Sequence, residues 1–128
     1  MDMKTARLVV LEDEAVMSTY ILNSLKRLGI QDLHAFTDGS AAIGEMAKLK
    51  PDLILTDIHM HPVGGLEFVR QLRALPHDQL SKTKVIFLSS DSSMETVEEA
   101  VPLGVSGYIV KPPNLGALAA KIEQALNS

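Results

Sequence analysis

Two hydrophobic patterns alternate along the chain. Five short apolar runs lack the in/out alternation of half-exposed strands, which is typical of strands buried on both faces. They cover residues 7–11, 33–37, 52–56, 85–88 and 108–110. After each run, apolar residues recur at helical spacing. These helical stretches are residues 15–28, 38–49, 66–75, a segment containing Met94, Val97 and Val101, and residues 115–126. The pattern predicts a β-strand followed by an α-helix, repeated five times.

Residues that favour helix ends mark several of these boundaries. Gly29 follows the first helical stretch and predicts its end, and Pro51 ends the second. Ser92 or Ser93 is placed to cap the fourth helix, and Asn114 to cap the last. The predicted elements are therefore separated by short connections.

A strand–helix alternation of this kind predicts an α/β fold. Strands covered by helices on both faces are parallel and buried, and right-handed crossovers distribute the helices over both sides. We therefore expect a doubly wound, flavodoxin-like (βα)5 fold with a five-stranded parallel sheet in the order 2-1-3-4-5. No linker, repeat or low-complexity segment interrupts the pattern, so residues 1–128 are expected to form one domain.

Composition and charge argue against several classes of function. The chain is 46% hydrophobic and 22% charged, which suits a globular domain, and it contains no cysteine. A net charge of −4, scattered basic residues and only two Tyr and three Phe argue against nucleic-acid binding. Nothing resembles a signal peptide, and no apolar stretch approaches the roughly 20 residues of a membrane span. We expect a soluble, cytoplasmic domain.

Acidic residues follow two of the predicted strands. Glu12 and Asp13 come directly after residues 7–11, and Asp57 comes directly after residues 52–56. Ligands of such sheets bind beyond the carboxyl ends of the strands, near the switch point between strands one and three. Three carboxylates gathered there cost free energy unless a cation neutralises them. The sequence therefore predicts a metal site, for Mg²⁺ or alternatively Mn²⁺.

Ser89 and Lys111 complete this edge of the sheet, because they end strands four and five. The set suits phosphoryl transfer to a carboxylate. A metal ion would join the acids to phosphoryl oxygens, Lys111 would add a positive charge, and Ser89 would donate a hydrogen bond. Asp57, as the nucleophile, would form an aspartyl phosphate.

On these residues the sequence resembles the receiver domain of two-component response regulators, chemotaxis regulators among them. The matching motifs are Glu12-Asp13, the segment 55–60 around Asp57, Ser89 at the end of strand four, and the segment 107–112. The resemblance covers the whole chain, from the first strand to the last helix.

The resemblance implies a role for each matching residue of the acidic edge. Asp57 would be the phosphoacceptor, and Glu12, Asp13 and Asp57 would bind Mg²⁺ together with the backbone carbonyl of His59. Lys111 would contact the phosphoryl group. The domain would not be an enzyme with a separate substrate, since it would catalyse only its own phosphorylation and dephosphorylation.

The resemblance also implies a switch and its partners. Ser89 and Tyr108 match a pair in which the hydroxyl moves to the phosphoryl group and the ring turns inward behind it. The Lys111–Pro112 bond is expected to be cis, an isomer almost confined to X-Pro bonds. The donor would be a phosphohistidine on a sensor histidine kinase or histidine phosphotransfer protein. The fourth helix, fifth strand and fifth helix would form the output surface, read by a downstream protein, a further output domain or a second copy in a phosphorylation-dependent homodimer.

Residues beside the phosphoryl site are expected to set the lifetime of the phosphorylated state. His59, Ser90 and Asp91 occupy such positions. An alternative for His59 and His61 is a transition-metal site, but alternate residues of a loop project in different directions. We expect instead that these residues modulate dephosphorylation.

Three departures from the family pattern affect the expected structure. His61 stands where the family usually has proline, so the loop after strand three is expected to differ. Gly64-Gly65 replaces an acidic-glycine pair and is expected to add backbone freedom. Pro102 falls in the last turn of the fourth helix, which is therefore expected to end early or to kink.

Three other readings remain open at this stage. Asp13 could serve only as the cap of the first helix. The chain could be a phosphatase that works through an aspartyl phosphate, although Asp57 is followed by Ile58 and His59 rather than by a second acid two residues on. It could also be a receiver-like interaction module that is never phosphorylated.

Overall fold

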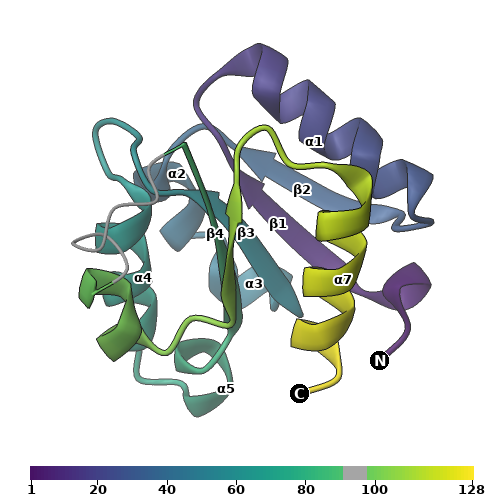
Figure 1. Ribbon diagram of the computed structural model, residues 1–128. Coiled ribbons are helices and arrows are strands. Elements are labelled where there is room, and N and C mark those ends of the chain that lie inside the picture. Colours follow the sequence, from purple (N-terminus) through teal and green to yellow (C-terminus); the bar gives the residue numbers. More distant parts are fainter. Residues whose placement is uncertain (91–97) are drawn as a thin grey trace.

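The computed structural model describes residues 1–90 and 98–128 and contains the expected parallel sheet (Figure 1). The five strands pair in the order β2-β1-β3-β4-β5. They are β1 Arg7–Leu11, β2 Asp32–Phe36, β3 Leu53–Asp57, β4 Lys84–Ser89 and β5 Gly107–Val110. Every strand begins and ends within one residue of its predicted range. The flavodoxin-like, doubly wound prediction is confirmed.

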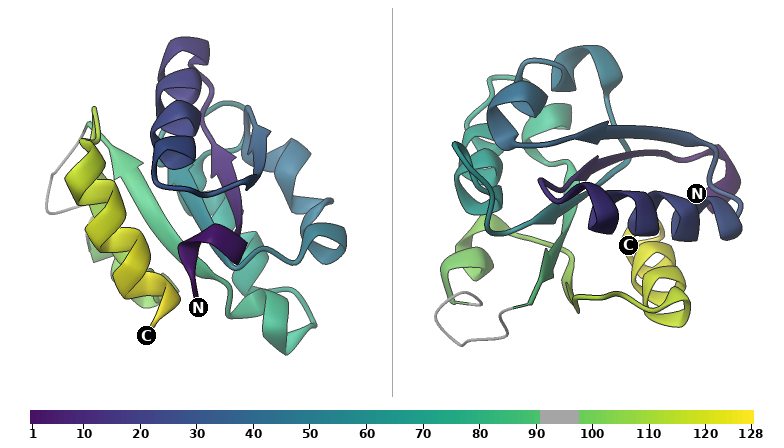
Figure 2. Two further views of the ribbon diagram at one scale, coloured as in Figure 1. Left: turned by 90° about the vertical axis from the view of Figure 1, so that its right-hand side faces the viewer. Right: turned by 90° about the horizontal axis from the view of Figure 1, so that it is seen from above.

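Helices cover both faces of the sheet (Figures 1 and 2). On one face lie α1 (Ala15–Arg27) and α7 (Leu115–Leu126). On the other lie α2 (Gly39–Ile43), α3 (Met46–Leu49) and α4 (Gly65–Arg73), with α5 (Asp78–Ser81) after α4. Two short 3₁₀ turns, η1 (Met3–Thr5) and η2 (Val101–Leu103), precede β1 and β5.

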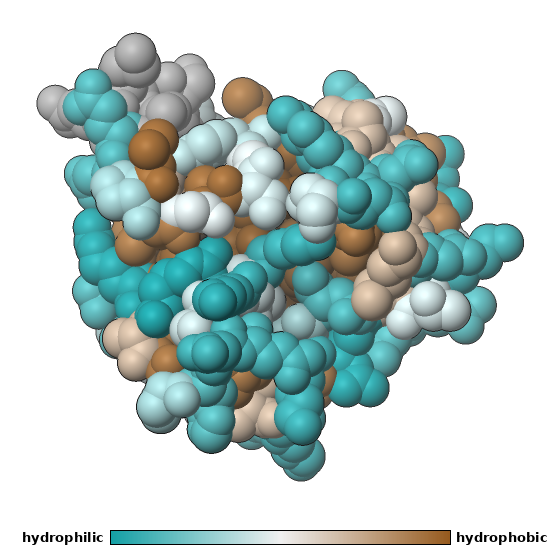
Figure 3. All heavy atoms as spheres, turned by 90° about the horizontal axis from the view of Figure 1, so that it is seen from below, coloured by the Kyte–Doolittle hydropathy of each residue, from teal (hydrophilic) through white to brown (hydrophobic). Residues whose placement is uncertain are grey.

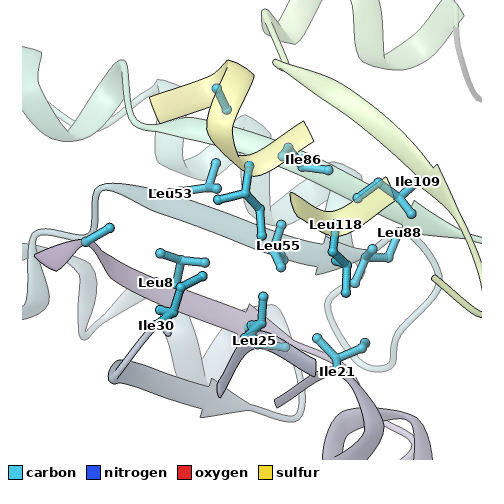
Figure 4. Close-up of a cluster of buried hydrophobic side chains, with 14 of the residues drawn as sticks. Leu8, Ile21, Leu25, Ile30, Leu53, Leu55, Ile86, Leu88, Ile109 and Leu118 are labelled. Carbon is cyan, nitrogen blue, oxygen red and sulfur yellow. The ribbon is translucent and has the colours of Figure 1, made fainter. Parts of the chain in front are cut away.

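The sheet has a hydrophobic core on each face, because successive strand residues point to opposite sides. Beneath α1 and α7, strand residues such as Leu8 and Leu55 pack against Ile21, Leu25 and Leu118 (Figure 4). The opposite core joins another set: Val9, Leu11, Ile54, Phe68, Leu72 and Phe87. Both alternating positions of each central strand are thus buried, which explains the continuous apolar runs.

The helix expected over residues 38–49 is divided into α2 and α3. The N–H of Glu45 bonds to the carbonyl of Ala42, three residues back, at 3.0 Å, so the backbone tightens after Gly44. Glycine within a helix costs about 1 kcal/mol relative to alanine, which makes this the weak point of the segment. The expected polar connection over residues 76–83 contains α5, which is too short to show helical periodicity and buries only Leu80.

Three of the predicted helix ends are confirmed. Gly29 has φ +90°, and Ile30 N–H bonds to the Leu25 carbonyl at 3.2 Å, which closes the end of α1. The Asn114 side chain accepts the N–H of Ala117 at 2.7 Å and caps α7. Lys50 ends α3 in the left-handed conformation, directly before Pro51.

Pro102 has the predicted effect on the fourth helix. Residues 98–100 are helical, and the chain then enters the 3₁₀ turn η2, which contains Pro102 and ends at Gly104 with φ +66°. The Arg73 guanidinium secures this turn by donating to the carbonyls of Leu103 at 2.7 Å and Thr83 at 2.7 Å. Four residues predicted for the fourth helix lie outside the described residues. They are the proposed caps Ser92 and Ser93 and the apolar residues Met94 and Val97.

The face seen from below in Figure 1, where the strands begin, is formed mainly by hydrophilic residues, with hydrophobic ones in smaller groups between them (Figure 3). Within the part of the chain that the structure describes, no helix has the length and apolar character needed to cross a membrane.

Candidate functional site

Strand alternation brings Glu12, Asp57 and Lys111 to one face of the sheet. The residues two positions before them belong to the core beneath α1 and α7: Val10, Leu55 and Ile109. Asp57 pairs with Leu88, and Leu88 with Ile109, so the strand ends lie at similar heights. Asp57 is the last residue of β3, and Glu12 and Lys111 directly follow β1 and β5, so the three side chains continue the same inward positions at the carboxyl ends of these strands.

Lys111 joins the two buried acids directly. Its Nζ lies 2.7 Å from Glu12 Oε1 and 2.9 Å from Asp57 Oδ2. The side chains of Glu12, Asp57 and Lys111 are only 0%, 8% and 13% exposed, so water screens these ion pairs weakly. Sequence reasoning placed Lys111 against a phosphoryl group but did not anticipate its bond to Glu12.

Burial and charge act in opposite directions on these groups. Burial raises the pKa of Glu12, and the hydrogen bond from Lys111 reduces that rise without cancelling it. Burial alone would lower the pKa of Lys111, but its bonds to Glu12 and Asp57 outweigh the burial, and the pKa is raised. The ammonium is therefore held in its charged form between the two acids.

Backbone amides complete the environment of the two carboxylates. The N–H of Glu14 donates to Glu12 Oε2 at 3.2 Å, and the N–H of His59 donates to Asp57 Oδ1 at 3.3 Å. Glu14 is the N-cap residue of α1, and the helix has no side-chain cap. The alternative in which Asp13 only caps this helix therefore finds no support.

Glu12, Asp13 and Asp57 fit a metal ion. Each offers a carboxylate oxygen, and these oxygens lie within 4.8 Å of one another. Two of the residues are buried and Asp13 is exposed, which leaves a side on which water ligands can complete a shell. Oxygen-only donors suit Mg²⁺, and the ammonium drawn between two of the acids shows that the site favours positive charge.

The alternative histidine site finds no support. The exposed side chains of His59 and His61 form no metal-binding group with other described residues. The role of the His59 carbonyl as a ligand stays a prediction.

Ser89 and Tyr108 lie on the α4 side of the sheet. Ser89 ends β4 at 5% exposure and continues the alternation of Phe87, which belongs to the α4 core. Tyr108 pairs with Phe87 across the strands, with ring centroids 6.1 Å apart and an interplanar angle of 32°. Burial raises the pKa of Tyr108. Tyr108 thus lies across from the residue two positions before Ser89, on the same side of the sheet, and the switching role of the two residues stays a prediction.

The loop after β3 packs against the back of Asp57. A Cβ at Gly65 would overlap the Asp57 carbonyl oxygen, and one at Gly64 would lie 2.8 Å from the Ile58 carbonyl oxygen. Gly64 has φ −79°, which any residue adopts. The two glycines are therefore needed for space rather than for the expected backbone freedom, because their lack of a side chain lets the loop approach the backbone of Asp57 and Ile58 closely. The loop also contains a cis His61–Pro62 bond, and Lys111–Pro112 is cis as predicted.

A groove of about 450 Å³ opens beside the acids, between the start of α1 and the end of β2, and Glu12, Asp13, Ser18 and Thr37 contribute to its lining. A hollow of about 560 Å³ between α3 and α5 lies away from them, near Lys50 and His77. Of the predicted modulators, His59 and Ser90 are exposed, and Asp91 lies outside the described residues.

Tyr20 is a site neighbour that sequence reasoning missed. Its hydroxyl donates to the carbonyl oxygen of Pro113 at 2.7 Å and so connects α1 with the loop that follows Lys111. The two residues are 93 positions apart, and neither belongs to a motif that would signal the contact.

Residues 8–123 match the model of the response regulator receiver domain. The chain is 27% identical over 121 residues to chemotaxis protein CheY-3 of Vibrio cholerae, covering 94% of this chain and 92% of that protein. It is 29% identical over 123 residues to CheY1 of Helicobacter pylori, covering 95% and 98%. Chemotaxis response regulator CheY4 of Vibrio cholerae has a similar solved structure, with a TM-score of 0.84, 26% identity, and coverage of 94% and 98%.

Proposed function

The chain belongs to the response regulator receiver family, and we propose that it is a cytoplasmic phosphorylation switch with Asp57 as phosphoacceptor. The observation that carries the proposal is the position of Asp57. Its carboxylate is buried at the end of β3, within reach of two further acids and bonded to the Lys111 ammonium. A receiver domain implies exchange with histidine kinases or phosphotransfer proteins, and we propose that such a protein is the donor.

In the proposed reaction, a carboxylate oxygen of Asp57 attacks the phosphorus atom of a phosphohistidine. The new P–O bond forms as the P–N bond breaks, and the imidazole leaves with the electron pair and takes up a proton. Water later attacks the same phosphorus atom, which releases inorganic phosphate and restores the carboxylate. The protein promotes both steps on itself, and the resulting binding surface, rather than a small molecule, is its product.

The neighbours of Asp57 have distinct tasks in this scheme. Lys111, held at Glu12 and Asp57, is placed to transfer a hydrogen bond from Asp57 to a phosphoryl oxygen while it keeps its bond to Glu12. Glu12, Asp13, Asp57 and the His59 carbonyl would hold Mg²⁺ or Mn²⁺, which neutralises phosphoryl charge when bound. The exposed His59 and Ser90 would affect the approach of water, as would Asp91.

The Ser89 hydroxyl would follow the phosphoryl group, and the Tyr108 ring would move behind it. Two exposed apolar residues support an output surface on this part of the chain: Val101 of η2 is 65% exposed and Val110 of β5 is 60% exposed. Partner proteins, a further domain or a second copy of the chain would bind that surface, and the turn that contains Pro102 would change its shape from the family's usual one.

Phosphate uptake tests the proposal. Wild-type protein with Mg²⁺ and radiolabelled acetyl phosphate is expected to acquire acid-stable, hydroxylamine-sensitive label, and Asp57→Asn to acquire none. Asp78→Asn, which removes an exposed acid on α5, is the matched control and should label normally. Full labelling of Asp57→Asn would falsify the assignment of the phosphoacceptor.

The same assay separates the rival functions. Absence of label from the wild type would favour the interaction module. Sustained hydrolysis of a small phosphate ester, with many turnovers per protein, would favour the phosphatase. That outcome is unexpected, because the second position after Asp57 is an exposed histidine rather than an acid.

A further inference from the structure

The loop that carries Lys111 is attached to α1 by a hydrogen bond. The Tyr20 hydroxyl donates to the Pro113 carbonyl oxygen at 2.7 Å, two residues beyond Lys111. Figure 1 shows this loop passing next to α1 on its way from β5 to α7. Since α1 begins two residues after Asp13, the bond connects the segment that holds Glu12 and Asp13 with the segment that holds Lys111.

The composition of the loop makes this bond important. Pro112 and Pro113 have no N–H, so their backbone cannot donate. On the β5 side, the last backbone hydrogen bond is the one that the Lys111 N–H donates to the Ser89 carbonyl at 3.0 Å. On the α7 side, the first hydrogen bond is the helix cap, in which the Asn114 side chain accepts the N–H of Ala117. Within residues 1–90 and 98–128, the Tyr20 hydroxyl supplies the one hydrogen bond to residues 112 and 113.

We propose that Tyr20 is a positioning residue for Lys111. By fixing the Pro113 carbonyl it fixes the loop, and through the loop it holds the Lys111 ammonium at its contacts with Glu12 and Asp57. Its effect on phosphorylation rests on the function proposed above, whereas its effect on Lys111 does not.

The phenol is suited to a test of this role. Tyr20 is 44% exposed, so Tyr20→Phe removes the hydroxyl without emptying a core position. Ser24→Ala is the matched control, because it removes a hydroxyl of the same helix that bonds at 2.9 Å to the Tyr20 backbone carbonyl, away from the loop. Thermal unfolding of both variants verifies that each is folded.

The first measurement is the rate of phosphate uptake from acetyl phosphate with Mg²⁺. Tyr20→Phe is expected to slow uptake about five-fold, the size of effect expected from one hydrogen bond. Ser24→Ala should label at the wild-type rate. In a Lys111→Ala background Tyr20→Phe should cause no further loss, because residues that act through one another are not additive. An unchanged rate in Tyr20→Phe, or an equal fold-loss in both backgrounds, overturns the inference.

The second measurement needs neither donor nor metal. The ¹⁵N resonance of the Lys111 ammonium is expected to shift or broaden in Tyr20→Phe and to stay unchanged in Ser24→Ala. An unchanged Lys111 signal in Tyr20→Phe overturns the positioning role. If the wild type takes up no phosphate, the proposed function fails, and the ammonium signal alone decides whether Tyr20 positions Lys111.

Discussion

Lys111 and Glu12 form a buried ion pair, with Nζ and Oε1 2.7 Å apart, across 99 positions of sequence. The pair connects the end of β5 with the end of β1, on opposite sides of β3. Lys111 also bonds to Asp57, so its ammonium contacts the acids at the ends of both β1 and β3. The ammonium thus supplies a positive charge within the acidic group, and its removal should have measurable consequences.

Lys111→Met is expected to destabilise the fold in the absence of divalent metal. The change leaves Glu12 and Asp57 buried without their cation, and removal of one partner from a buried pair costs about 3 kcal/mol. Added Mg²⁺ should recover part of this loss by binding the folded state. Urea unfolding with and without Mg²⁺ measures both effects. Lys84→Met, whose ammonium donates to the exposed Ser128 carbonyl away from the acids, serves as control. Equal stability of Lys111→Met and wild type would contradict the prediction.

The same ion pairs predict a loss of stability at high pH. The pKa of Lys111 is raised in the fold above its ordinary value of 10.5 by the bonds to Glu12 and Asp57. Its contribution is therefore complete below 10.5 and disappears as pH rises through the higher folded-state pKa. The difference in unfolding free energy between wild type and Lys111→Met should shrink across that window. A difference that stays constant to the end of the titration would exclude the ion pairs as its source.

Two glycine substitutions should change stability in opposite directions. Gly65→Ala places a Cβ against the Asp57 carbonyl and should cost about 3 kcal/mol, the upper end of the range for overpacking. Gly44→Ala is the matched case, because it meets no atom within 4 Å and has φ −70°. That change should stabilise by about 0.5–1 kcal/mol, since alanine restricts the unfolded chain. Chemical unfolding measures both, and a tolerated Gly65→Ala would show that the loop yields without cost.

Asp32, on the edge strand β2, should titrate below its ordinary value of 3.8. Its pKa is lowered first by the hydrogen bond from Arg7 and then by that from His34. The contribution to stability is present above 3.8 and is lost as pH falls through the lower folded-state pKa. In Arg7→Met the pKa of Asp32, followed by NMR, should move up. The pKa of Asp38, which is lowered by Ser40, should not respond. An equal rise in the pKa values of Asp32 and Asp38 would instead indicate that the substitution changes the whole structure.

The strands and most helix ends could be predicted because their causes are local. A central parallel strand is buried on both faces, so it appears as an uninterrupted apolar run, and Gly29 and Asn114 end or begin helices by their own conformations and side chains. The division of the second helix at Gly44 and the short helix α5 escaped prediction. Gly44 interrupts a stretch whose apolar residues keep a helical spacing on both sides of it, and α5 has only four residues, too few to show a period.

By itself the sequence determined the order of strands and helices, the family, and the arrival of three acids, a serine and a lysine at one edge of the sheet. Chain alternation and connection rules are enough for that. The tertiary structure alone decided that Lys111 bonds to Glu12 as well as Asp57, that Gly65 must lack a side chain, and that Tyr20 holds Pro113. The two hydrogen bonds join residues distant in the chain, and all three contacts depend on strand register and helix packing, which no local pattern encodes.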